Sequence, residues 1–525
     1  MSESNFRLTY ATMYNPPEEL HTNYKIEVDK IRNNLGREFG MLIDGKEVFA
    51  DEKFEDRSPI NTENVLGIFQ KGNTAHAEMA LKAARRMAKP WGQTPWQDRV
   101  ALVRKAADRI DERIYEFGAV LSLEVGKNRM EALADAAETA DLMRYSADQM
   151  EANNGFVVKM DEDPLEGYKA VNYSILKPYG VWVVISPFNF PAALTGGPVG
   201  AALVAGNTVV IKPATDTPWT SRLIAECFLE AGFPDGVVNY VTGPGSTVGQ
   251  RLVDSPEVDG MTFTGSYLVG MSIYRSFANG KYPRPIILEM GGKNPAVVTK
   301  NADLERAAQG IYRSAFGLQG QKCSATSRVL VEEPVYDQLV SKLKGLTEQA
   351  VIGDPTEKDT FLGPVANQSA YNDYKSFTEE LSQAGEFLVG GKVRTEGALG
   401  KGYFVEPTIA LDVPINHRLW KEEMFLPITM IHKVKGLDEA MEIANDVDYG
   451  LTAGIFGSKQ EIQQYFDNVE AGVVYANRPQ GSTTGAWPGF QPFGGWKGSG
   501  SSGKNAGGHY YLQLYMHEQV NTVIE

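Results

Sequence analysis

The sequence predicts an α/β protein whose parallel sheets are covered by helices on both faces. From about residue 181, short β-branched runs alternate with helical segments, and the runs include "VWVVI", "TVVIKP", "VVNYV", "MTFTG", "PIILE" and "PAVVT". A second alternating series begins with "NADLERAAQG" and continues to about residue 476. Alternation of this kind produces parallel sheets. Because 525 residues exceed a single hydrophobic core, we expect two or three domains.

The elements expected before residue 181 are a hairpin and three helices. "GMLIDGKEVFA" predicts a hairpin that turns on Asp44 and Gly45, a dipeptide suited to tight turns. Two amphipathic helices follow, and a third covers residues 129–150. In the second helix, apolar residues at spacings of three and four form one stripe, made of Val103, Ala106, Ile110, Ile114 and Phe117.

The uncharged segment 181–211 is long enough to cross a membrane, but we expect it to be buried in the protein. Residues that interrupt any continuous helix there are Pro187, Pro191, Gly196, Gly197 and Pro198. The pattern instead predicts a strand, a sharp turn, a buried helix and a second strand. The next helix is expected to begin at Thr217 and Pro218 and to end at Gly232.

Composition excludes several classes of protein. The formal net charge of −15 argues against a nucleic-acid partner, because such proteins need a basic surface. The two cysteines, Cys227 and Cys323, are too few for a disulfide framework and too far apart for a metal-ligand pair, so we expect no metal site. The first twenty residues lack the basic-then-apolar pattern of a secretory leader. We therefore expect a cytoplasmic protein without membrane association.

Cys323 lies in "GLQGQKCSATSRVLV", between a glycine-punctuated turn and a strand-like run. A free cysteine is most often a small buried hydrophobe, whereas a nucleophilic thiol needs help to ionise. The adjacent Lys322 offers a positive charge, and the turn offers backbone N–H groups. A cysteine hydrolase would instead need a histidine base, and the candidates are His21, His76, His417, His432, His509 and His517.

Glu289 and Asn189 are two further candidates for chemistry. Glu289 ends the apolar run "PIILE", where the active sites of α/β proteins gather, and partial burial would raise the pKa of its carboxyl toward that of a general base. The alternative is a capping carboxylate. Asn189 lies between two prolines on a turn after a strand, so its amide suits an oxyanion donor. The alternative is an amide that only satisfies the backbone of the turn.

Three turns at strand ends predict a dinucleotide site. Gly243, Gly245 and Gly249 follow the run "VVNYV", while "IKPATDTP" at 211–218 and "FTGS" at 263–266 close two other strands. Each of these motifs is weak alone. Their occurrence at successive strand ends is better support for a nucleotide than any one of them.

Together the motifs resemble the NAD(P)-dependent aldehyde dehydrogenase superfamily. "SPFNFP", "IKPAT", "FTGS", "LEMGGKNPAVV", "GQKCSA", "KEEMFLP" and "QPFGG" occur in the order and at the spacings of that family, from about residue 40 to the carboxyl terminus. The resemblance implies a Rossmann-type cofactor domain, an α/β catalytic domain and a β oligomerisation flap. It also implies NAD as the cofactor and a small aldehyde as the substrate.

The resemblance assigns roles to individual residues. Cys323 is expected to form a thiohemiacetal with the aldehyde, Asn189 and the Cys323 backbone N–H to bind the oxyanion, and Glu289 to activate the water that hydrolyses the thioester. The expected cofactor-binding residues are Ser186, Pro187, Phe188, Lys212, Thr215, Gly245, Gly249, Phe263, Gly265, Ser266, Glu423 and Phe425.

Within the superfamily the chain is most similar to the 1-pyrroline-5-carboxylate dehydrogenases, which oxidise L-glutamate γ-semialdehyde to L-glutamate in proline degradation. The similar stretches are "LEVGKN", "GLQGQKCSA", "STTGAWPGFQPFGG" and "GKNAGGHYYLQLY". The resemblance implies a substrate site formed by Glu124, Lys322, Ser324, Gly485, Ala486 and Phe493. Alternatives that remain are another small aldehyde such as succinate semialdehyde or glyceraldehyde, a CoA-acylating relative, and an inactive relative with a binding or structural role.

The sequence departs from the family pattern at three places. Leu426 occupies the position of a usual glycine, and Trp487 and Pro488 are inserted in the substrate loop. Thr215 occupies a position where many NAD-preferring members have a glutamate on the ribose hydroxyls. Without that carboxylate, a 2′-phosphate meets no repulsion, so we expect NADP to be accepted as well.

The family pattern also divides the chain. Residues 1–159 and 179–290 are expected to form the cofactor domain with an N-terminal arm, residues 291–505 the catalytic domain, and residues 160–178 and 506–525 the flap. The carboxyl-terminal run "YLQLYMHEQVNTVI" has no obvious strand partner in sequence, and an unpaired edge is a liability. We therefore expect it to pair with another subunit of a homo-oligomer, a dimer or an assembly of dimers.

Overall fold

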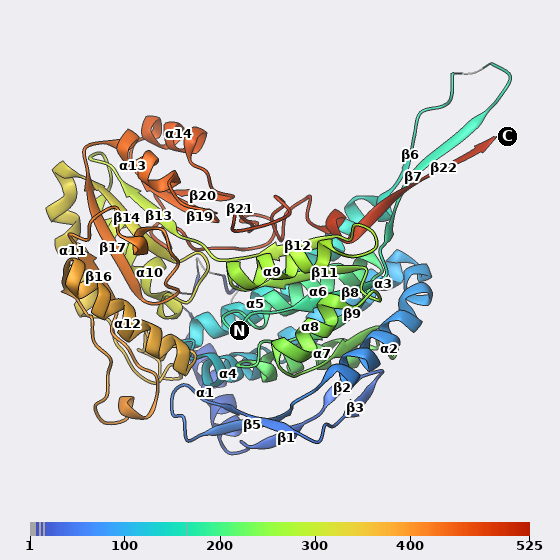
Figure 1. The fold of residues 1–525 in the computed structure, drawn as a ribbon, viewed down its shortest axis with the longest axis horizontal. Coiled ribbons are helices and arrows are strands. Elements are labelled where there is room, and N and C mark those ends of the chain that lie inside the picture. Colours follow the sequence, from blue (N-terminus) through green and yellow to red (C-terminus); the bar gives the residue numbers. More distant parts are fainter. Residues whose placement is uncertain (1–6, 10–11, 14–15, 165, 525) are drawn as a thin grey trace.

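Two seven-stranded sheets lie on opposite sides of the molecule, and a three-stranded arm projects from it (Figure 1). The computed structural model describes residues 7–9, 12–13, 16–164 and 166–524. Residues 1–6, 10–11 and 14–15, on which part of the expectation about a leader rests, lie outside the described residues.

The first sheet has the strand order β12-β11-β8-β9-β10-β2-β3 and is parallel from β12 to β10. The predicted hairpin closes it, with Asp44 and Gly45 at φ values of 55° and 72° between β2 and β3. Its strands are β2 (Met41–Ile43), β3 (Lys46–Val48), β8 (Val181–Ile185), β9 (Thr208–Lys212), β10 (Val238–Tyr240), β11 (Gly260–Thr264) and β12 (Ile286–Glu289).

Helices cover both faces of this sheet. The predicted second helix is in fact two, because Arg113 leaves the helical region at φ −104° and ψ 16°. Its guanidinium pairs with Glu116, Glu226 and Glu230 and so anchors the break. The helices are α1 (Glu18–Arg32), α2 (Thr74–Gln93), α3 (Trp96–Glu112), α4 (Ile114–Val125), α5 (Arg129–Ala152), α6 (Ala193–Ala205), α7 (Pro218–Ala231), α8 (Gln250–Asp254) and α9 (Tyr267–Ala278).

The uncharged segment 181–211 forms β8, a turn, α6 and β9, as predicted. Among the described residues, no helix combines the length and apolar character needed to cross a membrane. Three glycines let α6 lie directly against α5: a Cβ on Gly196, Gly197 or Gly200 would come within 2.3, 2.9 or 2.7 Å of α5 side chains. This contact fixes α5 beside the turn that precedes α6.

The second sheet has the order β15-β16-β17-β14-β13-β19-β20, and β15 is its one antiparallel strand. The run "PAVVT" starts this sheet instead of continuing the first. The strands are β13 (Asn294–Val298), β14 (Thr326–Glu332), β15 (Glu386–Val389), β16 (Thr408–Leu411), β17 (Ile428–Val434), β19 (Thr452–Phe456) and β20 (Val473–Ala476). The helices are α10 (Leu304–Phe316), α11 (Tyr336–Glu348), α12 (Gln368–Ala384), α13 (Leu437–Asn445) and α14 (Lys459–Asn468).

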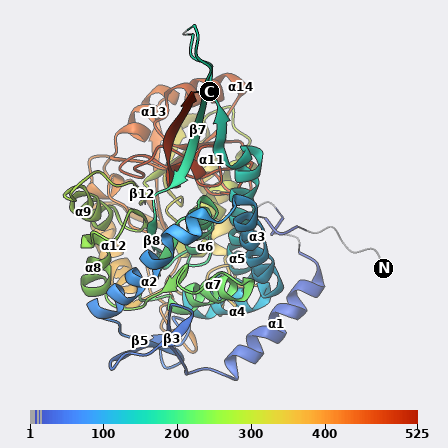
Figure 2. The ribbon, with the colours of Figure 1, turned by 90° about the vertical axis from the view of Figure 1, so that its right-hand side faces the viewer.

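The carboxyl-terminal strand has a partner within its own chain, which corrects the expectation that its only partner is another subunit. β22 (Met516–Ile524) runs antiparallel to β7 (Ala170–Pro178) over nine residues, and β6 (Val157–Lys159) lies on the other side of β7. Figure 2 shows the strands of this arm leaving the body together. The two strands have equal length, so β7 offers a complete edge. The two small sheets contain β1 (Arg37–Phe39), β4 (Lys53–Arg57) and β5 (Val65–Gln70), and β18 (Tyr449–Gly450) and β21 (Trp496–Lys497).

Candidate active site

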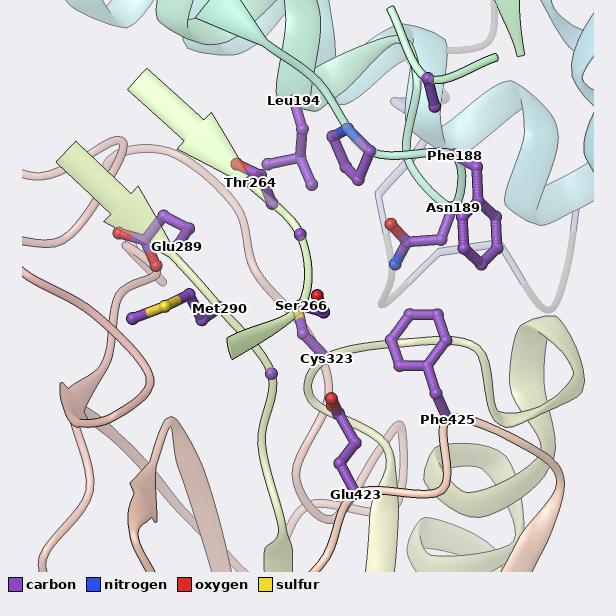
Figure 3. Close-up of a pocket in the computed structure, with 14 residues that line it drawn as sticks. Phe188, Asn189, Leu194, Thr264, Ser266, Glu289, Met290, Cys323, Glu423 and Phe425 are labelled. Carbon is purple, nitrogen blue, oxygen red and sulfur yellow. The ribbon is translucent and has the colours of Figure 1, made fainter. Parts of the chain in front are cut away.

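A cavity of about 380 Å³ lies where β8, β11 and β12 end and the second sheet begins (Figure 3). Carboxyl ends of parallel strands are the usual place for a ligand site in an α/β sheet. Figure 3 shows Asn189, Cys323 and Glu289 around one space, with Glu423 below Cys323 and the ring of Phe425 below Asn189. The lining residues are Pro187, Phe188, Asn189, Leu194, Ala214, Thr264, Gly265, Ser266, Glu289, Met290, Gly291, Cys323, Glu423 and Phe425.

Cys323 follows a strained turn. Leu318 and Gln319 both have left-handed backbone, with φ values of 49° and 53°, which residues other than glycine rarely adopt. The side chain of Gln319 holds the turn by donating to the carbonyls of Gly126 and Pro364 at 2.9 and 2.7 Å. Such strain persists only where the surroundings over-determine it, and it is common at active sites.

Glu131 of α5 ties both ends of this turn. One carboxylate oxygen accepts the ammonium of Lys322 at 2.5 Å, and the other accepts the backbone N–H of Leu318 at 2.8 Å. Both charged side chains are buried. The positive charge of Lys322 is therefore matched by Glu131, so its expected help to the thiol is offset.

The thiol of Cys323 lies in an environment that disfavours the thiolate. Burial raises the pKa of Cys323, and the carboxyls of Glu423 and Glu289 raise it further. The backbone N–H groups of Ser324 and of Cys323 itself oppose this shift. This environment favours the neutral thiol, so a nucleophilic reaction at the sulfur needs a proton acceptor.

Glu289 is a buried carboxyl at the end of β12. Burial raises its pKa well above the usual range, and its Oε2 has no hydrogen-bond partner among the described residues. Its backbone carbonyl accepts the N–H of Gly265 at 3.1 Å, which fixes the strand end. A carboxyl with a raised pKa and an unused oxygen in a cavity is suited to take up a proton.

Asn189 reaches from the turn before α6 to the turn before Cys323. Its Nδ2 donates to the carbonyl of Gln321 at 2.9 Å, and Figure 3 shows the amide directed into the cavity. One N–H of the amide therefore holds the turn that carries the nucleophile. The second N–H of the same nitrogen can serve an oxygen bound beside the sulfur.

Six of the residues expected to bind the cofactor lie outside the lining of this cavity. The ammonium of buried Lys212 donates to the carbonyl of Pro213 at 2.9 Å, and burial lowers the pKa of Lys212 to about 8. Gly249 lies against the Lys212 side chain, where a Cβ would be 3.4 Å away, and Gly245 has open space around it. Buried Ser186 has a hydroxyl without a partner among the described residues, and Thr215 is exposed.

Glu423 and Phe425 also line the cavity. Glu423 accepts the backbone N–H of Gly292 at 2.9 Å, and burial raises the pKa of Glu423 to about 7. The ring of Phe425 meets that of Phe188 edge to face at 5.8 Å between centroids. Phe425 has a φ of 55°, so the backbone before Leu426 is distorted at the place where the sequence departs from the family pattern.

A smaller compartment of about 50 Å³ opens on the other side of Cys323. It brings together five of the six residues expected at the substrate: Lys322, Ser324, Gly485, Ala486 and Phe493. Gly485 has a φ of 136°, and a Cβ there would be 2.2 Å from the guanidinium of Arg478, so only glycine fits.

A model of the Aldehyde dehydrogenase family matches residues 48–521. The chain belongs to this family. The resemblance expected from the motifs is thereby confirmed. None of the residues that line the described compartments around Cys323 is a histidine, so the site of this aldehyde dehydrogenase gives no support to a cysteine hydrolase.

Within this family, the chain is similar over nearly its full length to proteins named 1-pyrroline-5-carboxylate dehydrogenase. This aldehyde dehydrogenase is 42% identical over 502 residues to the 1-pyrroline-5-carboxylate dehydrogenase of Geobacillus sp. (strain WCH70), with 94% of each chain covered. It is 40% identical over 508 residues to 1-pyrroline-5-carboxylate dehydrogenase 2 of Bacillus subtilis (strain 168), with 96% of each chain covered. A solved structure of 1-pyrroline-5-carboxylate dehydrogenase from Thermus with bound NAD superposes with a TM-score of 0.92, at 34% identity and full coverage of both chains.

Glu124 does not line the smaller compartment of this aldehyde dehydrogenase, so the structure does not bring it together with the other five residues expected at the substrate. Its carboxylate accepts the backbone N–H groups of Trp219 and Thr220 at 2.6 and 3.1 Å and thus caps α7. Thr217, which was expected to cap this helix, occupies the N-cap position without a side-chain bond. Burial raises the pKa of Glu124, which lies beside the buried carboxyl of Asp56.

Phe263 is also absent from the lining of the larger cavity. Its ring packs in an apolar cluster with Leu288 and Met290 and fills the space beside Gly265, where a Cβ would be 2.6 Å away. Phe263 therefore supports the cavity wall from behind, while Gly265 and Ser266 line it. The hydroxyl of Ser266 also accepts the N–H of Val269 at 3.4 Å and caps α9.

Glu138 lines the substrate compartment, and the sequence analysis missed it. Burial raises the pKa of Glu138 to about 8. The nearby lysines Lys127 and Lys322 pair with Asp135 and Glu131 instead. The signal was present in the sequence, because Glu131, Asp135 and Glu138 follow one face of α5 at spacings of four and three.

Proposed function

We propose that this aldehyde dehydrogenase oxidises L-glutamate γ-semialdehyde to L-glutamate with NAD, the reaction of proline degradation. The observation that carries the proposal is the position of Cys323 between two compartments. One is lined by six of the residues expected for the dinucleotide, and the other by five of those expected for the substrate and by the buried acid Glu138. The relatives named 1-pyrroline-5-carboxylate dehydrogenase support the same substrate.

The residues present fit NAD. The free hydroxyl of Ser186, the ammonium of Lys212 and the open turn at Gly245 offer polar partners for ribose and phosphate. Glu423 and Phe425 would hold the nicotinamide end of the dinucleotide. When bound there, NAD supplies the acceptor for the hydride of the aldehyde carbon. Thr215 leaves the 2′ position without an opposing carboxylate, so NADP is also accepted.

In the first step the sulfur of Cys323 attacks the aldehyde carbon. A carbon–sulfur bond forms, the carbonyl oxygen becomes negative, and the thiol proton leaves for a base. The second N–H of Asn189 and the backbone N–H of Cys323 stabilise the oxyanion from fixed positions, so little reorganisation is needed. The thiol proton passes to solvent in the cavity, so Glu289 keeps its unpartnered oxygen for the water of the second step.

In the second step the carbon, now at the oxidation level of a thioester, is attacked by water. Glu289 takes the proton of the water as the carbon–oxygen bond forms, and the carbon–sulfur bond then breaks. Cys323 leaves as a thiolate and regains a proton, because burial favours the neutral thiol. The presence of Glu289 to deliver water is what disfavours the CoA-acylating alternative.

The substrate compartment suits an amino acid aldehyde. The Ser324 hydroxyl and the backbone N–H groups of Gly485 and Ala486 form a nest for the α-carboxylate. Glu138 becomes a carboxylate when the α-ammonium supplies a positive charge beside it. Phe493 covers the aliphatic part of the substrate. Succinate semialdehyde and glyceraldehyde lack the ammonium group and so leave Glu138 unpaired.

Steady-state kinetics over an aldehyde panel test this function. L-glutamate γ-semialdehyde, succinate semialdehyde and glyceraldehyde are oxidised in turn while NADH formation is followed. We expect the highest kcat/KM for L-glutamate γ-semialdehyde. A higher value for either of the other two overturns the substrate, and no turnover with any aldehyde favours the inactive relative.

We also propose a division of the chain and a homo-oligomer. The cofactor domain takes residues 1–159 and 179–290, the catalytic domain residues 291–505, and the oligomerisation flap residues 160–178 and 506–525. The change from one sheet to the other between β12 and β13 supports the second boundary. Among the described residues, no strand pairs with the outer edge of β22, which leaves backbone groups for a second copy of the chain. Light scattering tests the oligomer.

A further inference from the structure

Trp487 closes the space around Cys323 from the side of the substrate loop. It lines a compartment of about 60 Å³ together with Cys323, Glu138 and Phe493. Its side chain is only 2% exposed, so the indole is part of the compartment wall and not a surface residue. The compartment is small beside the cavity of about 380 Å³ on the other side of Cys323.

The indole is anchored from outside the compartment. Its Nε1–H donates to Oδ2 of Asp141 at 2.8 Å. Asp141 lies one turn after Glu138 on α5. Neighbouring turns of one helix therefore carry Glu138, which lines the compartment, and Asp141, which holds the indole of its wall. The same Asp141 oxygen accepts the guanidinium of Arg7, and Arg144 lies 3.9 Å from the other oxygen.

The loop that carries Trp487 has little freedom to move the indole. Trp487 and Gln491 exchange two backbone hydrogen bonds of 2.9 Å each, which closes a tight turn. Gly489 donates to the carbonyl of Gly507 at 2.9 Å, and Arg478 binds the carbonyl of Thr484. The loop is thus held from two sides, and the bond to Asp141 fixes the remaining side-chain rotation.

We propose that Trp487 limits the length of the aldehyde chain that Cys323 accepts, and that Asp141 is a positioning residue that holds the indole in the wall. The inference rests on the proposed function, because it requires an aldehyde bound at Cys323. It concerns size and not the charged groups of the substrate, so it applies to simple alkanals as well.

Chain-length selectivity of Trp487 variants is the test. The ratio of kcat/KM for octanal to that for propanal is measured for the wild type, Trp487→Ala and Trp487→Leu. Where turnover of these alkanals is too slow, their inhibition constants against oxidation of L-glutamate γ-semialdehyde are compared instead. One methylene in an apolar pocket changes kcat/KM by roughly 10–200-fold, so we expect Trp487→Ala to raise the ratio at least about tenfold and Trp487→Leu to raise it less. Phe490→Ala is the matched control, because Phe490 is in the same loop and 60% exposed.

Three further variants test Asp141. Asp141→Asn keeps an oxygen acceptor for the indole and should leave the ratio unchanged, whereas Asp141→Leu should raise it toward that of Trp487→Ala. Arg7→Gln removes the ion pair without touching the indole bond, so its ratio should stay that of the wild type.

Specific outcomes overturn each part. An unchanged ratio in both Trp487 variants overturns the length limit. An unchanged ratio in Asp141→Leu, or an increased ratio in Arg7→Gln, overturns the positioning role. An error in the proposed substrate gives a different result. If the wild type oxidises alkanals but not L-glutamate γ-semialdehyde, the substrate is wrong, but the octanal-to-propanal ratio can still be measured.

Discussion

The ammonium of Lys322 lies 2.5 Å from the carboxylate of Glu131. Lys322 immediately precedes Cys323, the nucleophile of the proposed mechanism. Both side chains of the ion pair are about 5% exposed. The pair links α5 to the strained turn before Cys323 and leaves no net charge from Lys322 at the thiol. Its function is therefore to hold the turn, and it can be tested as such.

Glu131→Gln and Lys322→Met should each destabilise the protein. Removing one member of a buried pair leaves the other uncompensated, at a cost of about 3–5 kcal/mol. The double variant should recover part of this loss, because no buried charge then remains. Urea unfolding midpoints provide the measurement, with Glu112→Gln as a control for a surface pair worth about 0–1 kcal/mol. Equal midpoints for Glu131→Gln and the control would contradict the role of the pair.

Cys323→Ala should abolish NADH formation, while Glu289→Gln should release one burst of NADH and then stop. The burst is expected because acylation of Cys323 precedes the step in which Glu289 activates water. Rapid-mixing absorbance measurements follow the burst. If Glu289→Gln binds NAD normally but gives no burst, Glu289 is not the base of deacylation.

Glu138→Gln should discriminate between substrates. It removes the carboxylate proposed to face the α-ammonium, so kcat/KM for L-glutamate γ-semialdehyde should fall by about tenfold or more. The value for succinate semialdehyde should change little, because that aldehyde carries no ammonium. A uniform fall for both aldehydes would indicate that Glu138 acts only in the packing of α5.

Glu138 should also make stability depend on pH. Its pKa is about 8 in the folded protein and 4.5 as a free side chain, so the folded state holds the proton over a range where the unfolded state has lost it. The stabilisation is complete below about pH 4.5 and is lost as the pH rises through about 8. Glu138→Gln should therefore reduce the fall in unfolding free energy between these values, measured by urea unfolding at each pH. An identical fall in wild type and variant would show that the group does not titrate in this way.

Thr215→Glu should increase the preference for NAD over NADP. The new carboxylate would repel a 2′-phosphate. Such like-charge contacts cost several kcal/mol, which corresponds to about a hundredfold or more in the ratio of kcat/KM values. Thr215→Gln is the uncharged control of nearly equal size. A wild type that already excludes NADP would show that another group performs this discrimination.

The sequence predicted those parts of the fold and site that depend on local pattern. The strand ends that carry Asn189, Glu289 and the cofactor turns were predictable, because alternation and glycine punctuation locate them. Glu138 was missed because its position depends on how α5 packs against α6. The glycines of α6 permit this close packing, but their presence in the sequence does not predict it. Glu124 was misplaced because only the structure shows that the N-terminus of α7 lies against its carboxylate.

The pairing of β22 could not be predicted from local pattern either. Its partner β7 lies 338 or more residues earlier, and a strand carries no signal that distinguishes an edge in its own chain from one in another. The break at Arg113 was hidden for a related reason, because the apolar stripe continues across it. Three acidic partners from other parts of the fold stabilise the break.

Substitutions at the glycine-lined contact between α5 and α6 should change the geometry of the active site in laboratory evolution. α5 carries Glu131, Glu138 and Asp141, whereas the turn that leads into α6 carries Asn189. A methyl group added at Gly197 or Gly200 would separate the two helices and shift the acidic side chains relative to the amide. Directed selection for new aldehydes should therefore recover substitutions in this helical seam, remote from any atom that touches the substrate.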